Sequence, residues 1–396
     1  MRILHTSDWH LGRSFHREGM LGHQAAFVDH LLEVVEEERV DLVVLAGDVY
    51  DRALPPVDAV RLAGEAFSRI AASPARLVVT SGNHDSAHRL GFGADLIDAA
   101  GVFIRTRASS VGTPVLLADE HGPVAVYGLP YLDPDHLREP WSLPARSHEA
   151  ALAEAMRRVH ADLTDRPVGT RSVVLAHAFV AGGDDEGAVV ETSDSERDIS
   201  VGGVSIAPTR LFTDVSYAAL GHLHGRHTLT ETVRYSGSPL AYSFSEATHR
   251  KGAWLVDLGA DGVRSATFVD APVPRPLARL RGSLDTLLSD PALARHEGAW
   301  VQAVLTDAAR PRQAMERLRR RFPHTLVLGF EPAGGGGASA VPTARHSPGG
   351  DAIAPIAREF LSDVRGGLAA SPEEAALLQS ACDGCTPDAD LDREAG

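Results

Sequence analysis

The sequence contains very few cysteines. Only Cys382 and Cys385 occur among 396 residues, and both lie near the C-terminal end. A disulfide framework cannot hold the core of such a chain, which indicates a reducing compartment. The two form a lone C-x-x-C pair. Because a structural zinc site needs four ligands, we assign them no function.

Positive charge and long apolar runs are also scarce. The 38 Lys and Arg residues stand against 53 Asp and Glu, giving a formal net charge of −15, and Lys251 is the sole lysine. This balance excludes a protein that coats nucleic acid through a uniformly basic surface, so any polyanion contact must be local. No apolar run approaches the ~18 residues of a membrane span, and the first residues become polar too soon for a signal peptide. We therefore expect a cytoplasmic protein without membrane contact.

The length, at about 150 residues per domain, predicts two to three domains. Through about residue 270, short apolar runs alternate with longer amphipathic segments, which is typical of an α/β domain. We expect strands over 2–6, 42–46, 77–80, 124–127, 172–176 and 217–220. The apolar stripes of 23–39 and 57–72 predict helices.

A second part of the chain begins after Pro272, Pro274 and Pro276. Strands over 277–280, 299–305 and 325–330 and a helix over 312–321 predict a small α+β module. The glycine-rich segment 333–351 indicates a flexible linker, followed by a helical tail over 352–381 and an acidic, disordered end over 382–396.

The tail carries an apolar stripe at helical spacing. Its members are Ile353, Ile356, Phe360, Leu361, Val364 and Leu368. A helix this short cannot bury such a stripe alone, so it needs a docking surface. That surface belongs either to the chain's own domain or to a partner.

Metal-binding side chains follow five of the expected strands. They are Asp8, His10, Asp48, Asn83, His177, His222 and His224. Strand ends of an open α/β sheet meet at one edge, so these residues can converge. A set of two carboxylates, one amide and four imidazoles without a thiolate favours Mn²⁺, Fe²⁺ or Zn²⁺ over Ca²⁺, with Mg²⁺ still possible.

Seven ligands suit two cations that share one bridging carboxylate. Such a pair, about 3.5–4 Å apart, is the usual device for in-line attack on a phosphate ester, so phosphoester hydrolysis is the first hypothesis. A single histidine is more often structural, and we expect this of His5, which lies inside the first strand. The joint pattern favours a metal site.

The motifs resemble those of the calcineurin-like metallophosphoesterase superfamily. They are D-x-H at 8–10, G-D at 47–48, G-N-H-D at 82–85, the strand-end His177 and G-H-x-H at 221–224. Residues 1–12 and Y-S-G-S-P at 235–239 are similar to the SbcD family, the nuclease subunits of bacterial SbcCD complexes. The likeness extends to about residue 381 and is weakest in the linker.

This resemblance implies an α/β fold, a four-layer sandwich of two mixed β-sheets flanked by helices, over 1–271. The 272–332 module would cap the active site, and the 352–381 tail would bind the coiled coil of the ATPase partner SbcC. It also implies a homodimer, formed through the helix pair within 23–72. The expected substrates are double-stranded DNA ends, single strands and hairpins.

The resemblance also assigns the site residues. Asp8, His10 and His224 would hold one metal ion, and Asn83, His177 and His222 the other, with Asp48 bridging; Mn²⁺ is the expected metal and Mg²⁺ an alternative. His84 would stand over the scissile phosphate, and Asp85 would orient the His84 ring.

Alternative interpretations of the function and of several residues remain open. The G-D-x-x-D-R run at 47–52 resembles that of phosphoprotein phosphatases, in which Arg52 would grip phosphate, although Ala53 follows where they have glycine. A small-substrate phosphoesterase and an architectural subunit that bridges DNA ends are the alternative functions. The five arginines within 312–321 form either a solvated helix face or a phosphate-tracking one. The acidic stretch 184–198 is expected to be a mobile loop.

Overall fold

The computed structural model of the chain describes residues 1–182, 193, 194, 196, 206–332, 357, 358, 361, 362 and 369–383. It forms two compact units: Met1–Arg279 with His296–Gln302, and Leu280–Arg295 with Ala303–Gly396. The expected linker, the apolar stripe of the 352–381 tail apart from Leu361, most of the acidic stretch 184–198 and nearly all of the acidic end lie outside the described residues. The domain boundaries drawn from the sequence remain predictions.

The first sheet of the larger unit has the strand order β16-β15-β1-β4-β5-β6. Its strands are β1 (Arg2–Thr6), β4 (Leu42–Ala46), β5 (Arg76–Thr80), β6 (Val102–Arg105), β15 (Gly252–Gly259) and β16 (Gly262–Asp270). The first four run parallel, whereas β15 is antiparallel to both β1 and β16. In this pairing Arg2 lies opposite Asp257, so the sheet is completed by strands from the end of the unit.

The second sheet has the order β13-β14-β12-β9-β8-β7. Its strands are β7 (Val115–Asp119), β8 (Gly122–Leu129), β9 (Arg171–His177), β12 (Tyr217–Gly221), β13 (His227–Thr228) and β14 (Val233–Tyr235). The four inner strands are parallel, and both edge strands are antiparallel to their neighbours. Both sheets are therefore mixed.

Alternate side chains of the central strands face different cores, as the two-residue period of a strand requires. In β4, whose five residues are all buried, Leu42 and Val44 join the core between the two sheets. Val43 and Leu45 join the core on the other face of the first sheet. A strand buried on both faces explains the continuous apolar run in the sequence.

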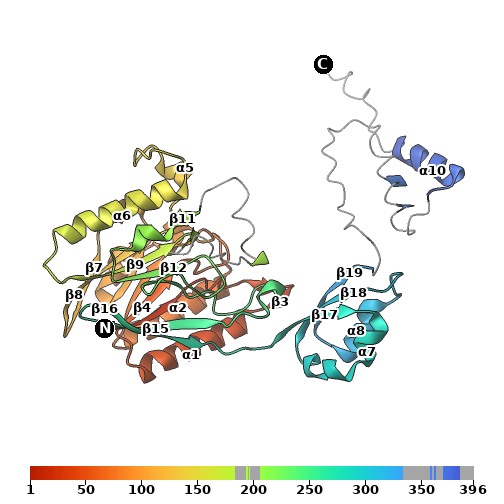
Figure 1. The fold of residues 1–396 in the computed structure, drawn as a ribbon, viewed down its shortest axis with the longest axis horizontal. Helices are drawn as coiled ribbons and strands as arrows, with labels where there is room; N and C mark the ends of the chain where they lie inside the picture. Colours follow the sequence, from red (N-terminus) through yellow and green to blue (C-terminus); the bar gives the residue numbers. More distant parts are fainter. Residues whose placement is uncertain are drawn as a thin grey trace, which may run out of the picture. The chain divides into compact units, whose positions relative to one another are not determined.

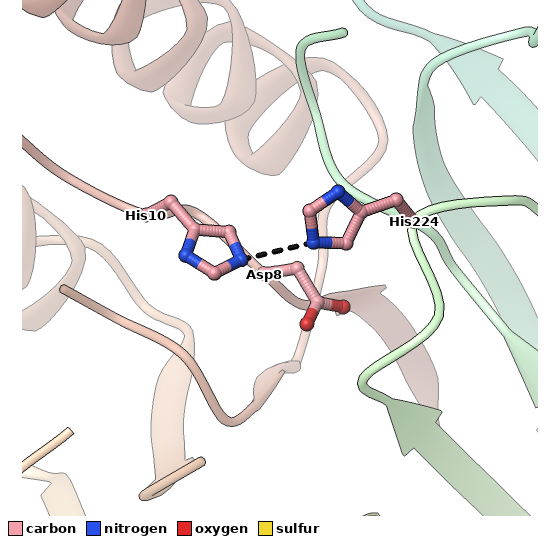
Figure 2. Close-up of side chains that lie close together, drawn as sticks. All are labelled: Asp8, His10 and His224. Atoms are coloured by element: carbon pink, nitrogen blue, oxygen red, sulfur yellow. Dashed lines mark hydrogen bonds between the residues drawn. The ribbon is translucent and has the colours of Figure 1, made fainter. Parts of the chain in front are cut away.

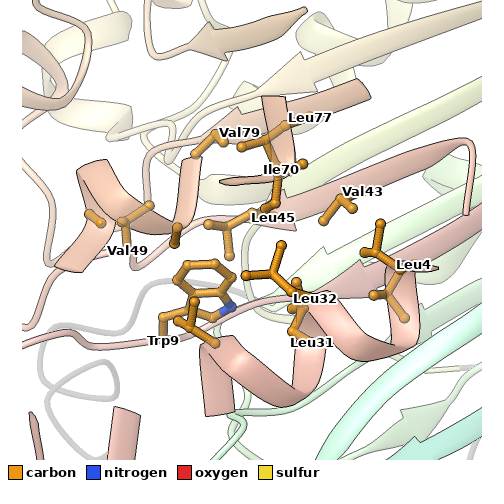
Figure 3. Packing of buried hydrophobic residues seen from close by; sticks show 14 of the residues in the cluster. Leu4, Trp9, Leu31, Leu32, Val43, Leu45, Val49, Ile70, Leu77 and Val79 are labelled. Carbon is orange, nitrogen blue, oxygen red and sulfur yellow. The ribbon is translucent and has the colours of Figure 1, made fainter. Parts of the chain in front are cut away.

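Helices cover the outer faces of both sheets. On the first sheet, α1 (Leu21–Glu37) and α2 (Val57–Ala72) contribute Leu31 and Ile70 to the core that also holds Trp9 (Figure 3). On the second, α6 (His148–Thr164) lies on the side opposite α1 (Figure 1). This is the predicted sandwich of two mixed sheets flanked by helices.

The helix α6 was not predicted from the sequence. Its buried stripe is partly made of small residues, including Ala151 and Ala155, so its apolar periodicity is weak. The chain fixes its start with Ser147, whose side chain accepts a hydrogen bond from the Ala150 N–H at 3.1 Å.

The small α+β module has a three-stranded sheet in the order β17-β18-β19. Its elements are β17 (Leu277–Gly282), α7 (Leu284–Ser289), β18 (Trp300–Leu305), α8 (Ala314–Arg321) and β19 (Thr325–Phe330). The predicted strands and helix are present with ends shifted by at most two residues, and α7 is additional. In the tail, α10 spans Pro372–Asp383.

Short elements occupy the loops. They are β2 (Ser14–Phe15), β3 (Glu18–Gly19), α3 (Ala87–Leu90), α4 (Ala94–Ile97), α5 (Pro134–Leu137), β10 (Val180–Ala181) and β11 (Ala207–Pro208). Among the helices that the structure describes, none is both long and apolar enough to cross a membrane.

Candidate metal centre

All seven predicted ligands lie at or just beyond the carboxyl ends of five parallel strands. β1, β4 and β5 of the first sheet supply Asp8, His10, Asp48 and Asn83. β9 and β12 of the second sheet supply His177, His222 and His224. The site therefore needs both sheets. Except for Asn83, every one of these residues is buried.

The backbone at this edge is held in sparsely populated conformations. Four ligands that are not glycine have positive φ: Asp8 (54°), His10 (45°), Asp48 (50°) and His222 (105°). Such residues cost about 1–3 kcal/mol each and cluster at functional sites. Their concentration at one strand edge indicates that function, and not folding alone, selects this geometry.

Glycines let the two sheets approach each other here. A Cβ at Gly221 would lie 1.8 Å from the Ala46 carbonyl oxygen, and a Cβ at Gly47, where φ is 83°, would lie 2.2 Å from His177 Nδ1. No side chain fits at either position.

Asp8, His10 and His224 form the first ligand group, with ligand atoms within 4.8 Å of one another (Figure 2). The Nε2 atoms of His10 and His224 face each other at 3.0 Å. The Asp8 carboxylate accepts the His222 N–H at 3.0 and 3.1 Å and the Ser7 hydroxyl. Burial lowers the pKa of His10 well below its usual range, so this ring is neutral and keeps a lone pair.

Asn83, His177 and His222 form the second group. The Asn83 Oδ1 lies 2.9 Å from His177 Nε2 and 3.1 Å from His222 Nδ1, and the two nitrogens are 3.2 Å apart. His177 Nδ1 lies 2.9 Å from the Ala46 carbonyl oxygen, to which it donates. In the neutral ring, Nε2 therefore presents a lone pair to the Asn83 oxygen.

Two hydrogen-bond acceptors, Asn83 Oδ1 and the lone pair of His177 Nε2, would repel each other at 2.9 Å unless a positive charge lies between them. Burial alone would lower the pKa of His177, but the Asp48 and Asp8 carboxylates raise it to about 9. The proton on His177 supplies this positive charge in the structure, and a bound cation would supply it in its place. The mixed oxygen and imidazole donors therefore fit divalent transition metals such as Mn²⁺.

Asp48 lies between the two groups. Its Oδ2 is 3.4 Å from His177 Nε2 and 3.6 Å from His10 Nε2. Burial would raise its pKa, but the His177 and His10 rings hold the pKa of Asp48 below its usual range. Asp48 is thus an ionised carboxylate that lies between the two groups.

His84 lies at the rim of the cluster. Its N–H donates to Asp48 Oδ1 at 2.9 Å, and its ring meets the His10 ring edge-on at a centroid distance of 4.8 Å. The His84 Nδ1 lies 2.9 Å from the Asp51 carbonyl oxygen. This contact with the backbone carbonyl fixes the orientation of the His84 ring.

Asp85 makes no hydrogen bond to the His84 ring, although the resemblance predicted that it orients this ring. Its carboxylate accepts backbone N–H groups of Gly82, Val49 and Tyr50 at 2.9–3.1 Å. Burial and the Asp48 carboxylate raise the pKa of Asp85 to about 6. Asp85 therefore ties the loops after β4 and β5 together, and the Asp51 carbonyl orients the His84 ring.

Sequence reasoning missed three residues around His224. Its N–H donates to Glu196, its carbonyl accepts from Lys251 Nζ at 2.8 Å, and its Nδ1 lies 3.3 Å from Glu246 Oε1. Burial would raise the pKa of Glu246, yet Lys251 and His224 hold it well below its usual range. The one available signal was Lys251, a single lysine in an arginine-rich chain.

Two other sequence readings concern arginines and His5. Arg52 is 79% exposed and lies 3.6 Å from Asp51, the geometry of an ordinary loop ion pair. In α8, Arg317 pairs with Asp285, whereas Arg319 and Arg321 donate to backbone carbonyls. His5 contacts Tyr217 and Leu220 between the sheets, so its predicted structural role is confirmed.

Comparison with known proteins gives two family matches and likenesses to solved structures. The family model described as calcineurin-like phosphoesterase matches residues 1–226. The model SbcD_C, described as type 5 capsule protein repressor C-terminal domain, matches residues 273–343.

Among solved structures, TT1561 of Thermus thermophilus is 14% identical, with a TM-score of 0.38 over 67% of this chain and 98% of its own. GAP50, the anchor in the inner membrane complex of Plasmodium, is 10% identical, with a TM-score of 0.37 over 85% of this chain and 99% of its own. Neither likeness bears on function. The chain belongs, by the first family match, to the calcineurin-like phosphoesterases, and the second match gives it the domain pair of an SbcD-type nuclease subunit.

Proposed function

We propose that this phosphoesterase is a DNA nuclease subunit that cleaves double-stranded ends as an exonuclease and single strands or hairpins as an endonuclease. The observation that carries the proposal is the convergence of six buried ligand side chains and the exposed Asn83, with His84 at their rim. The SbcD_C match supports DNA over a small substrate, and it supports action together with an SbcC-type ATPase.

The ligands divide into two sets around Asp48. Asp8, His10 and His224 would hold one cation, and Asn83, His177 and His222 the other, with Mn²⁺ the proposed metal. Bound divalent cations would supply Lewis acidity and lower the pKa of water. The strained strand-end backbone keeps the donors in place before any cation arrives.

His84 acts on the substrate in this proposal. The Asp51 carbonyl fixes the ring at Nδ1, so Nε2 is available to stabilise charge on the phosphate or to protonate the leaving sugar oxygen. Its backbone N–H, bonded to Asp48, keeps the ring in register with the cation sites.

Association with partners is part of the same proposal. The exposed apolar side chains Leu54, Val57 and Val60, at or near the start of α2, support a homodimer through α1 and α2. The 352–381 tail is proposed to bind the coiled coil of the ATPase. A cytoplasmic location accords with the few cysteines.

The test uses blunt-ended and hairpin DNA with Mn²⁺ or Mg²⁺, with and without the ATPase. We expect metal-dependent cleavage, and we expect His84→Ala to lower the cleavage rate by about 10²–10⁴-fold because an acid–base group is lost. Mn²⁺ binding by calorimetry should stay unchanged in this variant. His88→Ala, at an exposed position of α3, is the matched control.

Three outcomes would contradict the proposal. Normal DNA cleavage by His84→Ala removes His84 from the reaction. Hydrolysis of a chromogenic phosphomonoester but not of DNA indicates a small-substrate phosphoesterase. Complementation of a deletion strain by Asp48→Asn indicates an architectural subunit.

A further inference from the structure

Every polar atom of His224 faces a defined neighbour. Glu196 accepts its N–H, Lys251 donates to its carbonyl oxygen at 2.8 Å, and Glu246 Oε1 lies 3.3 Å from Nδ1. The remaining nitrogen, Nε2, points toward His10 in the first ligand group (Figure 2). The Nδ1 side of the ring is thus fixed by Glu246, and the Nε2 side faces the proposed cation site.

The Glu246 carboxylate cannot turn away from His224. Its Oε2 accepts Lys251 Nζ at 2.6 Å and the Tyr242 N–H at 3.2 Å. Lys251 in turn uses its remaining donors on the His224 carbonyl oxygen and on Ser238 Oγ, the latter at 2.9 Å. The side chain of Glu246 is fully buried and that of Lys251 is 7% exposed, so water does not compete for these bonds.

This arrangement selects one tautomer of His224. A carboxylate only accepts hydrogen bonds, so a neutral His224 must carry its proton on Nδ1, which leaves the lone pair on Nε2. The tautomer of His224 is thus set by Glu246 from the side of Nδ1, while His224 Nε2 lies 3.0 Å from His10 Nε2.

We propose that Glu246, anchored by Lys251, is a positioning residue that fixes the His224 tautomer in which Nε2 can bind a metal ion. A histidine ligand whose other nitrogen donates to a carboxylate is a recurrent device in metal sites, where it sets ring orientation and raises ligand basicity. The inference rests on the proposed use of His224 as a metal ligand. It also explains why a buried Lys–Glu pair lies beneath the site.

The substitution Glu246→Gln tests this with little change in shape. Lys251 and the Tyr242 N–H only donate, so the amide oxygen of glutamine must face them. Its NH₂ group then points at His224 Nδ1 and favours the proton on Nε2. Nε2 of His224 then carries the proton and has no lone pair for the metal ion.

The first measurement is the ¹⁵N spectrum of histidine side chains in the metal-free full-length protein, with His224 assigned from its absence in His224→Gln. We expect a protonated Nδ1 in the wild type and in Glu246→Asp, and a protonated Nε2 in Glu246→Gln. The second measurement is calorimetric titration with Mn²⁺ alone. We expect Glu246→Gln to weaken binding by about 10–100-fold and Glu246→Asp to lie closer to the wild type. Glu65→Gln, an exposed position of α2, controls for the lost charge.

An unchanged His224 pattern in Glu246→Gln, a protonated Nε2 in the wild type or in Glu246→Asp, or Mn²⁺ affinity within about threefold of the wild type overturns the inference. Neither measurement uses DNA. A wild-type protein that binds Mn²⁺ but leaves DNA intact therefore defeats the proposed function alone, whereas absence of Mn²⁺ binding defeats both.

Discussion

A buried ion pair at the edge of the second sheet shows how much one carboxylate can contribute. Arg171 is 3% exposed and forms a two-pronged contact with Asp119, one prong at 3.0 Å. The same guanidinium also donates to the carbonyl oxygens of Gly122, Gly259 and Leu258. It therefore joins β9 to β7 and β8 of its own sheet and to β15 of the first sheet, and Arg171 holds the pKa of Asp119 below its usual range.

Replacing Asp119 by Asn should lower the free energy of unfolding by about 1.5–3 kcal/mol at pH 7, because a hydrogen-bonded charge pair is lost. A carboxyl whose pKa is lowered on folding stabilises above its unfolded pKa, near 4, and loses that effect as the pH falls through its folded pKa. The difference between wild type and variant should therefore shrink below about pH 4. Urea unfolding at pH 7 and pH 3 checks this, with Asp261→Asn, an exposed turn residue, as the control. A difference that is the same at both pH values contradicts the assignment.

At the scale of elements, the close approach of β12 to β4 decides the geometry of the site. Gly221 ends β12 where the Ala46 carbonyl of β4 leaves no room for a Cβ, and Ser7 Cβ is also within 2.9 Å of that position. The obstructing atom is backbone, so it cannot rotate away. The neighbours of Gly221 are the ligand His222 and, through Ser7, the ligand Asp8.

Gly221→Ala should destabilise the protein by about 1–3 kcal/mol, the usual effect of forcing atoms into a packed interior. It should also weaken Mn²⁺ binding, because the strand ends that carry the ligands must separate. Gly64→Ala in α2 is the matched control, since its added Cβ meets no atom within 4 Å. That variant should gain about 0.5–1 kcal/mol from helix propensity. Equal thermal stability of the two variants would contradict the packing argument.

At the scale of the whole molecule, the ligands couple the two sheets. A cation held by residues of both sheets binds the folded protein and not the unfolded chain, so it stabilises by about 2.7 kcal/mol at a concentration 100-fold above its Kd. We expect EDTA to lower Tm and Mn²⁺ to restore it. His84→Ala should respond in the same way, whereas Asp48→Asn should respond weakly. A Tm that is insensitive to both reagents would show that these residues hold no metal ion.

The parts of this molecule that the sequence predicts are those with local signals. Asp8 and Asp48 come two residues after buried strands and His177 ends one, and the strand ends of one sheet meet wherever the strands pair. The residues that hold His224 in place, in contrast, are not marked by any local sequence pattern. Glu246 ends a short 3₁₀ helix (Phe244–Glu246) and Lys251 directly precedes β15, and only the tertiary fold brings both next to His224. The role of Asp85 was misplaced because adjacency in the chain says nothing of where a carboxylate points.

The place of β15 in the first sheet has a consequence for synthesis on the ribosome. β1 pairs with β15, so Arg2 can pair with Asp257 only after the ribosome has synthesised residue 257. At about 5–20 residues per second, the nascent chain carries β1 for roughly 10–50 s with one edge unpaired. During that interval the unpaired N–H and C=O groups of β1 can form hydrogen bonds with strands of other polypeptides. The unfinished chain should therefore need a chaperone until translation has passed residue 259.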